Sequence, residues 1–552
     1  RKNMSLKSKP VKMPENCKLK ILTNGYVYYF TKSVWNAEKK RPEDDRICIG
    51  KLDETKTKLI PNQNYAKVFN IQVLEELGEI STELSVGQYI AIKRAANFFG
   101  AFEALKKNFP KSYEKIFALA LFMIDNSSNA SQQYEKWGFR NYSGLDINLS
   151  SQRISEIYSS IDEDSIHDFF KDYVKNYKKT NLIKKRLSLA FDSTNCNTNS
   201  DSLDLAEFGH AKDDKNLKII NSAYLVDQLT GIPICYENFY GSLLDKIETE
   251  YSINKFREIG FDKILLVMDR GYFSKKNKEI LSNEKYIFLM PETHSATNYI
   301  IDAYGKGIKD VSKYYISEEK GYGTRICLSS DELENYKDFK DEKIFLFYDS
   351  KRAEEERTAI LENANKMKEY VINNYKKYSN DLKEKYKNYL LISKDNKSEK
   401  GPFYVSINHQ LIQKRIDRAG FFVAITNDSL TPLQTLTTIR KRDCVEKVFK
   451  RMKDGLGLNT PLVHNNATYN GKMFVVFLAL NLIETFRWFE KSYFEKNSSS
   501  TTYTILGELS KIIFTFKNGT ITQKYALTAK QKNIFTNLAL PLNNITNLLA
   551  KD

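Results

Sequence analysis

The chain has 552 residues, several times the ~150 residues of an average domain, so we expect more than one structural unit. Hydrophobic residues make up 41% of it and charged residues 28%, a balance that argues against global disorder. Its 85 basic and 69 acidic side chains leave a net charge of +16, which favours a polyanionic partner, either nucleic acid or an acidic membrane surface.

Three further features narrow the class of protein. The longest apolar run, residues 473–483, is shorter than the ~20 residues that span a bilayer, so no membrane segment is expected. No charged-then-apolar leader opens the sequence, which argues against secretion. The six cysteines form no Cys-x-x-Cys pair, so neither a zinc ribbon nor a disulfide framework is expected. A cytoplasmic protein with reduced thiols fits best.

In chain order, residues 1–180 are predicted to form a hairpin followed by helices. Two short β-rich runs, 26–30 and 46–50, flank a polar stretch, which is typical of a hairpin. Apolar residues then recur at steps of three and four between residues 85 and 125, which predicts helices. A second helical stretch is predicted from about residue 150 to residue 178.

The character of the sequence changes near residue 185. Residues 187–191 alternate between apolar and small side chains and predict a strand that ends on Asp192. The apolar run 263–268 predicts a strand buried on both faces, and it ends on Asp269. If these strands are neighbours, both carboxylates emerge at the same edge of the sheet, where ligand sites of open α/β sheets lie.

Helices and strands are both predicted between and after these two strands. They are a hairpin at 219–238, a short helix at 253–260, β-like runs at 286–290, 324–328 and 343–348, a charged helix at 352–390, a strand at 421–426, and helices at 432–456 and 472–489.

A third acid, Glu446, lies on the predicted helix 432–456. At 100° per residue from Arg442, Glu446 falls at about 40° and Lys453 at about 20°, so the three share one face. The apolar residues of this helix would pack it on the sheet and bring Glu446 beside the edge that carries the two aspartates. Three converging carboxylates suit Mg²⁺ or Mn²⁺, and two such ions about 4 Å apart can drive chemistry at a phosphodiester.

The order and spacing of several motifs over about residues 185–480 resemble those of a DDE transposase of bacterial insertion sequences. The resemblance is to the subgroup with a Tyr-x-x-Arg-x-x-x-Glu signature, a Lys seven residues later, and a long insertion between the second aspartate and the glutamate. Ile439 stands at the tyrosine position, and Ser242 where the family usually has asparagine. The matching pieces are Leu187–Thr194, Gly209–Asp213, Gly231–Ile234, Gly241–Asp245, Met268–Tyr272, Gly420–Thr426 and Arg442–Lys453.

The resemblance implies an α/β fold: an RNase H-like mixed-sheet core with a β-rich insertion subdomain and a mainly helical N-terminal region. It implies two Mg²⁺ ions per site, with Mn²⁺ able to substitute, that cleave DNA at element ends and join 3′-hydroxyls to target DNA. The implied catalytic and metal-binding residues are Asp192, Asp269 and Glu446, and the DNA-binding residues would be Arg442, Lys453, Arg270 and Lys212.

The same resemblance predicts partners and organisation. The partner would be double-stranded DNA, as element terminal repeats and target, bound by a homodimer in a synaptic complex, in a bacterial cytoplasm and associated with the nucleoid. The expected boundaries are 1–180 for a DNA-end-binding region, 181–290 and 411–490 for the two parts of the core, 291–410 for the insertion, and 491–552 for a C-terminal tail with a role in dimerisation.

Other interpretations stay open at this stage. A lone aspartate at a strand end is usually a turn or cap residue, and Glu446 could be a surface partner of Arg442 four residues away. Arg442 and Lys453 could be solvated helix charges. As a whole, the protein could be a catalytically silent DNA-binding descendant of a transposase, which the Ile439 departure supports, or a nuclease that cuts without joining. Cleavage and joining assays separate these cases.

Overall fold

The chain divides into two units in the computed structural model. Unit 1 comprises Arg1–Thr180, Cys196–Ile220 and Val448–Asp552, and unit 2 comprises Asn181–Asn195 and Asn221–Lys447. Among the described residues, no helix has the length and apolar character that a membrane span requires. The structure describes residues 10–15, 17–36, 41–68, 82–180, 186–243, 245–261, 263–336, 339, 341–375, 379–394, 403–491, 501–517 and 520–549.

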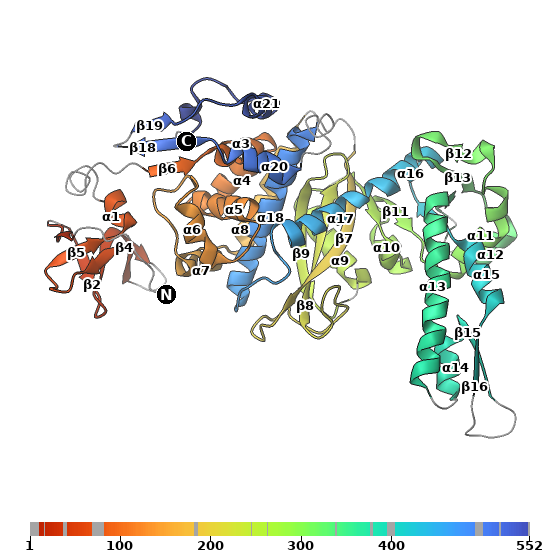
Figure 1. Ribbon diagram of the computed structural model, residues 1–552. Coiled ribbons are helices and arrows are strands. Elements are labelled where there is room, and N and C mark those ends of the chain that lie inside the picture. The colour runs from red at the N-terminus through yellow and green to blue at the C-terminus, as the bar shows by residue number, and fades with distance from the viewer. Residues whose placement is uncertain are drawn as a thin grey trace. The chain divides into compact units, whose positions relative to one another are not determined.

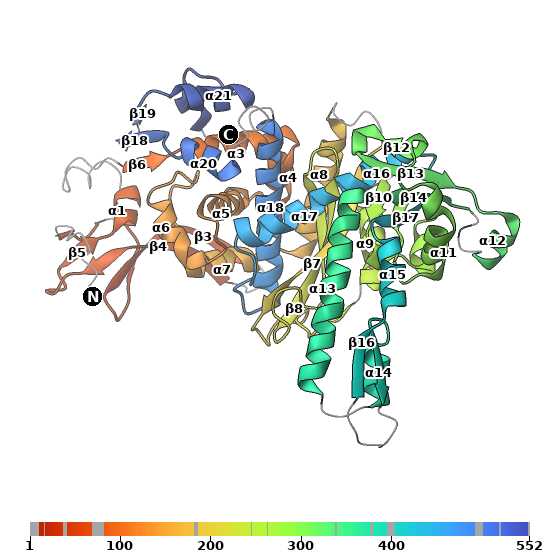
Figure 2. The same cartoon turned by 45° about the vertical axis from the view of Figure 1, so that its right-hand side comes forward.

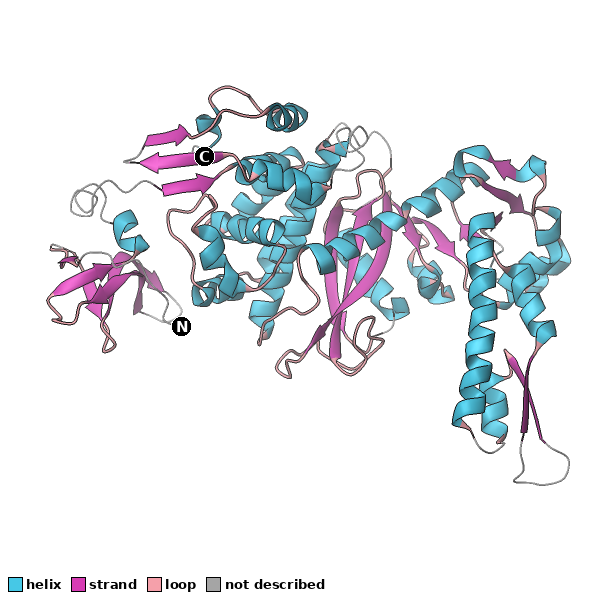
Figure 3. Ribbon diagram, viewed as in Figure 1, coloured by secondary structure: helices cyan, strands magenta, loops and turns pink. Residues whose placement is uncertain are grey.

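A nine-stranded mixed sheet organises unit 2 (Figure 3). Its strands, in spatial order, are β12 (Tyr315–Ile316), β13 (Gly321–Ile326), β14 (Lys343–Tyr348), β17 (Phe421–Thr426), β11 (Lys285–Leu289), β10 (Leu265–Met268), β7 (Ser188–Thr198), β8 (Lys218–Asp227) and β9 (Pro233–Tyr240). Strands β7, β10 and β11 are parallel, and β17 runs antiparallel to both of its neighbours, β11 and β14. The predicted hairpin at 219–238 is confirmed as the neighbouring strands β8 and β9.

The register between β7 and β10 brings the two predicted aspartates together. Met268 is paired with Phe191, so Asp269 and Asp192 are the next residues along two parallel, adjacent strands. The prediction that the first strand ends on Asp192 is wrong, because β7 continues to Thr198. The polar residues after Asp192 stay in the strand because they lie beside β8 and are buried. The expected proximity of the two carboxylates follows from the register all the same.

One face of this sheet packs on helix α16 (Pro432–Lys441). The buried cluster draws residues from five strands and from the helix, and it includes Leu265, Val267, Ile287, Phe345, Phe347, Phe422, Ala424, Leu436 and Ile439. The alternate residues of β14 and β17 in this list show the two-residue period of half-buried strands. Burying this cluster fixes α16, and with it the residues that follow the helix, against the sheet.

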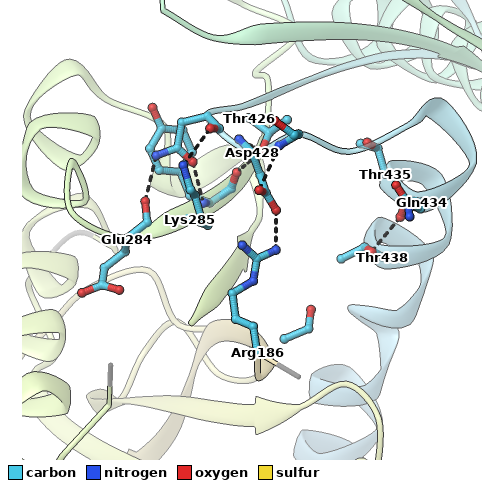
Figure 4. Close-up of polar contacts among 12 residues, drawn as sticks. Arg186, Glu284, Lys285, Thr426, Asp428, Gln434, Thr435 and Thr438 are labelled. Atoms are coloured by element: carbon cyan, nitrogen blue, oxygen red, sulfur yellow. Dashed lines mark hydrogen bonds and ion pairs between the residues drawn. The ribbon is translucent and has the colours of Figure 1, made fainter. Parts of the chain in front are cut away.

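A polar network holds β17 beside β11 at the start of β11 (Figure 4). Lys285 donates through Nζ to the carbonyl oxygen of Asn427 at 3.1 Å, and the Asn427 side chain accepts from the backbone N–H of Tyr286 at 3.1 Å. Beside them, Arg186 forms an ion pair with Asp428. Because β7, β10 and β11 are parallel, this network lies at the end of the sheet opposite Asp192 and Asp269, and its role is structural.

The remaining elements of unit 2 follow the sheet in sequence. They are α9 (Asp245–Glu258), α10 (Lys275–Ile280), α11 (Ser295–Tyr304), α12 (Ser330–Asn335), α13 (Ser350–Asn374), α14 (Asn380–Tyr386), β15 (Leu390–Lys394), β16 (Phe403–Ile407) and α15 (His409–Arg418), with α17 (Asp443–Lys450) running into unit 1.

Part of the segment between β11 and β17 forms an outer arm, residues 350–419. The arm extends away from the nine-stranded sheet in both views (Figures 1 and 2). Its two strands, β15 and β16, pair only with each other among the described strands, and its small core includes Val371, Leu382 and Ile392. By contrast, β12, β13 and β14 of the same segment extend the main sheet.

Helices dominate unit 1, and α18 (Asn466–Phe489) is central to them. It contacts α3 (Gly87–Phe98), α5 (Tyr113–Asn126) and α7 (Ser151–Ser159). Around these lie α4 (Ala101–Asn108), α6 (Tyr134–Gly138), α8 (Glu163–Lys179), α20 (Thr502–Leu509) and α21 (Ala529–Asn537), with a three-stranded sheet of β6 (Thr82–Ser85), β18 (Ile513–Lys517) and β19 (Thr520–Gln523). The helices predicted between residues 85 and 178 and between 472 and 489 are confirmed.

The predicted N-terminal hairpin is confirmed within a five-stranded antiparallel sheet. The spatial order is β1 (Val11–Lys12), β5 (Lys58–Pro61), β4 (Arg41–Leu52), β3 (Tyr26–Asn36) and β2 (Leu19–Ile21), with α1 (Gln63–Val68) following β5. This N-terminal sheet has its own core of Val11, Val27, Ile49, Leu59 and Tyr65.

Lys472 on α18 is a buried amine whose replacement should stabilise the protein. Its side chain is 1% exposed, and its Nζ has no hydrogen-bond partner among the described residues, so burial lowers its pKa to about 7. We expect Lys472→Met to raise the free energy of unfolding at pH 7 by about 2–4 kcal/mol, since one pKa unit corresponds to about 1.4 kcal/mol.

The sign of the pH dependence makes this prediction specific. Between pH 7 and pH 10.5 the unfolded chain binds a proton at Lys472 that the folded chain does not, so this group makes stability rise with pH. The advantage of Lys472→Met should therefore be largest at pH 7 and shrink towards pH 10 in thermal melts. Lys136→Met, at an exposed position of α6, is the control and should show neither effect. An equal stabilisation at both pH values would contradict the prediction.

Candidate active site

Three carboxylates from separate parts of unit 2 surround the guanidinium of Arg442. Its Nη1 lies 3.1 Å from Asp192 Oδ2, and its Nη2 lies 3.6 Å from Asp269 Oδ2 and 2.8 Å from Glu446 Oε1. The three acids predicted from the sequence therefore converge on one point.

Backbone geometry positions the two aspartates. Asp192 Oδ1 accepts a hydrogen bond from the N–H of Ser193 at 2.8 Å, and Asp269 Oδ1 accepts one from the N–H of Arg270 at the same distance. Asp269 is also the N-cap of the short 3₁₀ turn Arg270–Tyr272, which begins directly after β10. Each aspartate thus has one oxygen held by the main chain and the other directed at Arg442.

Arg442 lies at a break between two helices, and Glu446 lies in the first turn of the second helix. The prediction of one continuous helix over 432–456 is wrong. Helix α16 ends at Lys441, and α17 begins at Asp443 after hydrogen bonds of the three-residue type around Arg442. Glu446 lies one turn into α17, which keeps the predicted four-residue contact with Arg442 and leaves the carboxylate 55% exposed.

The electrostatics of the site favour a positive charge at its centre. Arg442 is only 13% exposed, and burial alone would lower its pKa. The negative charges of Asp269, Asp192 and Glu446 outweigh that effect and raise the pKa of Arg442 above its usual value. Three carboxylates and one guanidinium leave a formal charge of −2, which attracts further cations.

The three carboxylates have the oxygen donors that a divalent metal needs, but as they stand the described residues contain no group of three side chains placed to hold a metal ion. The guanidinium of Arg442 lies where the three carboxylates converge. Carboxylate oxygens are the ligands that Mg²⁺ and Mn²⁺ prefer. Asp269 and Glu446 are 40% and 55% exposed, so an ion can reach them from solvent.

The other predicted DNA-binding residues do not join this cluster in the described contacts. Lys453 belongs to unit 1, where its Nζ pairs with Asp213 Oδ2 at 2.6 Å. Residues 451–455 form a π-helical turn, so the 100° step on which the predicted face of Lys453 depends does not hold over this stretch. Arg270 forms an ion pair with Glu292, and Lys212 lies exposed in the loop between β7 and β8.

The sequence analysis did not predict the places of two residues near the site, Tyr272 and Ile439. The hydroxyl of Tyr272 lies 3.5 Å from Asp192 Oδ1, and the Asp-Arg-Gly-Tyr motif was the signal that could have suggested it. Ile439, at the tyrosine position of the resemblance, is 8% exposed and packs in the core between α16 and the sheet. The isoleucine therefore takes a packing role and leaves the three acids in place. Cys196 is buried, which raises the pKa of its thiol to about 11.

The fold and the site together define an RNase H-like core. Its strands lie in the order β9-β8-β7-β10-β11, β7, β10 and β11 are parallel, and two neighbouring strands each carry an acid. The family model for the transposase DDE domain matches residues 184–482, and the chain belongs to this family of DNA transposases. No well-characterised protein matches by sequence. Among solved structures, a cryo-EM structure of the piggyBac transposase synaptic complex with hairpin DNA is similar at a TM-score of 0.36 and 8% identity, over 84% of this chain and 86% of the other.

Proposed function

We propose that this transposase cleaves phosphodiesters at the ends of a bacterial insertion sequence and joins the freed 3′-hydroxyls to target DNA. Asp192, Asp269 and Glu446 would be the catalytic, metal-binding residues. The observation that carries the proposal is the convergence of these three acids, from two neighbouring strands and one helix, on the guanidinium of Arg442.

The chemistry follows from that arrangement. Asp192, Asp269 and Glu446 would hold two divalent ions, and the chemistry that such ions would supply is activation of a water or 3′-hydroxyl and stabilisation of the leaving oxygen of the phosphodiester. Asp192 and Asp269 provide fixed oxygens because the main chain holds each of them. Glu446 is more exposed and lies on a helix, so it can adjust its position as substrate enters. Arg442, when it turns from the carboxylates, has the charge and the planar donors to bind a phosphate.

The remaining assignments complete the proposal. Arg442, Lys453, Arg270 and Lys212 would contact the DNA backbone, which orients the strand without reading its sequence. Residues 1–180 and the insertion 291–410 would recognise the element ends, and two copies of the chain would act together in a synaptic complex in the bacterial cytoplasm. Residues 491–552 would contribute to dimerisation.

The test is a cleavage and joining assay on DNA that carries the element's own ends. We expect cleavage only when Mg²⁺ or Mn²⁺ is present and none in EDTA. With pre-cleaved ends, we expect products in which the 3′-hydroxyl is joined to target DNA. Cleavage without joining would identify a nuclease instead, and DNA binding without cleavage in Mn²⁺ would identify a silent descendant.

A further inference from the structure

The N-terminal sheet, β1 to β5, has one face that its own core does not use (Figure 1, red). Val27, Ile49 and Leu59 are fully buried and define the inner face. Because successive residues of a strand point to opposite faces, their neighbours along each strand define the outer face.

The strand pairing identifies the residues of the outer face. Directly paired residues of antiparallel strands share a face, so Tyr26 lies with Lys51, Tyr28 with Lys20, and Phe30 with Arg46. Lys58 pairs with Lys12 on the same side. Lys18 joins them, because its carbonyl oxygen accepts from the N–H of Phe30. The six cations of the outer face are Lys12, Lys18, Lys20, Arg46, Lys51 and Lys58, and all six are exposed.

The residues that stand directly opposite these cations on the neighbouring strands are aromatic, apolar or basic. The positions paired with Tyr26–Phe30 and with Lys58–Ile60 include no aspartate or glutamate on this side. The acids of this region lie outside these pairs: Asp53 and Glu54 in the turn between β4 and β5, Glu15 before β2, and Glu43, Asp44 and Asp45 on β4 before Arg46. A surface with six positive charges and no negative ones among its paired positions is complementary to a polyanion.

A row of aromatic rings on β3 holds three of these cations in place. Lys18 Nζ lies 4.7 Å from the ring centroid of Phe30, and Lys51 Nζ lies 5.4 Å from that of Tyr26. The guanidinium carbon of Arg46 lies 5.6 Å from the centroid of Tyr28. Cation–π contacts of this kind restrict long side chains before binding, which reduces the entropy cost of ordering them on a ligand.

We propose that this outer face binds the phosphate backbone of duplex DNA. Five strands at ~4.8 Å spacing make a face about 19 Å wide, which exceeds the ~12 Å width of the major groove. Its cations lie on β1 and β5 to one side of the aromatic row and on β2 to the other, so two backbones can be contacted at once. The ring faces are already covered by cations, which disfavours base stacking and hence single strands.

This inference rests on the proposed function only in that DNA is the substrate. The experiment uses the full-length protein in EDTA and a 40-bp duplex of arbitrary sequence, and measures affinity across a salt series. Each lost phosphate contact should lower the slope of log K against log salt by about 0.9. We therefore expect Lys18→Gln/Arg46→Gln/Lys51→Gln to lower the slope by about 2–3 and to weaken binding at least about tenfold.

Two further variants sharpen the result. Lys511→Gln/Lys530→Gln/Lys532→Gln removes the same charge at exposed positions of the C-terminal region and should leave the slope nearly unchanged. Tyr28→Leu/Phe30→Leu keeps every cation, so the slope should stay the same while the affinity falls about threefold or less.

The outcomes separate this inference from the proposed function. Equal salt slopes for the N-terminal triple variant and the wild type would overturn the proposed binding face. It would also be overturned if the triple variant lost affinity for a single-stranded probe but not for the duplex. Because no metal ion is present, the result does not depend on catalysis. A protein that binds in this way but never cleaves in Mn²⁺ would refute the proposed function and leave the binding face intact.

Discussion

Glu446→Gln should lower metal-dependent DNA cleavage by on the order of 10³-fold or more. The change removes a negative charge and a metal-binding oxygen while keeping the size of the side chain, and a loss of that size corresponds to about 4 kcal/mol of transition-state stabilisation. Glu446 is 55% exposed, so we expect the free energy of unfolding to change by less than about 1 kcal/mol. Single-turnover cleavage of pre-bound element ends measures the effect apart from DNA binding.

Asp443→Asn is the matched control for this variant. Asp443 lies on the same helix, is equally exposed, and pairs with Lys447 instead of Arg442. We expect its cleavage rate to stay within about twofold of the wild type, because surface ion pairs of this kind contribute little. If Glu446→Gln and Asp443→Asn cleaved at the same rate, Glu446 would have to be removed from the site and a different third ligand sought.

Arg442→Gln should make the protein bind Mn²⁺ about tenfold more tightly while it still cleaves poorly. In the wild type the guanidinium neutralises Asp192, Asp269 and Glu446, so an incoming ion competes with it. Without the guanidinium, three like charges repel one another, and the metal-free protein should lose about 1–3 kcal/mol of stability. Added Mn²⁺ should then raise the melting temperature of the variant by more than that of the wild type.

Arg440→Gln provides the comparison, two residues earlier in the chain. Arg440 pairs with Glu319 and Asp349 and touches none of the three site acids in the described contacts. Its loss should lower stability without altering the response to Mn²⁺. Calorimetric titration with Mn²⁺ in the absence of DNA gives the affinities directly. An unchanged Mn²⁺ affinity in Arg442→Gln would mean that the metal does not bind among these carboxylates.

The acidic cluster could be predicted from the sequence because strong local signals define each of its parts. An alternating run before Asp192 and an apolar run before Asp269 identify two strands, and the parallel register then brings the carboxylates together without further information. The four-residue spacing of Arg442 and Glu446 survives the helix break, because that spacing needs only a single helical turn.

Lys453 shows where such reasoning ends. Its predicted angular position depends on eleven successive steps of 100° from Arg442, so any change of helical winding between the two residues shifts that position. The π-helical turn at 451–455 is such a change, and the hydrophobic period of the sequence does not indicate it. The number of strands in the main sheet could not be predicted either. The pairing of β14 with β17 joins residues about 80 positions apart, and such a pairing leaves no local pattern in the sequence.

The outer arm leaves and re-enters the sheet at one point. The N–H of Asp349 donates to the carbonyl oxygen of Gly420 at 2.9 Å, so the residues on either side of the arm are already hydrogen-bonded neighbours. Gly420 has a φ of +82°, and a Cβ there would lie 2.5 Å from that of Ala353, so only glycine closes this junction without strain. Because the two ends of the arm already meet through this hydrogen bond, the pairing of β14 with β17 does not depend on the length of the chain between them. Shortening or exchanging the arm should therefore leave the strands of the catalytic sheet in place.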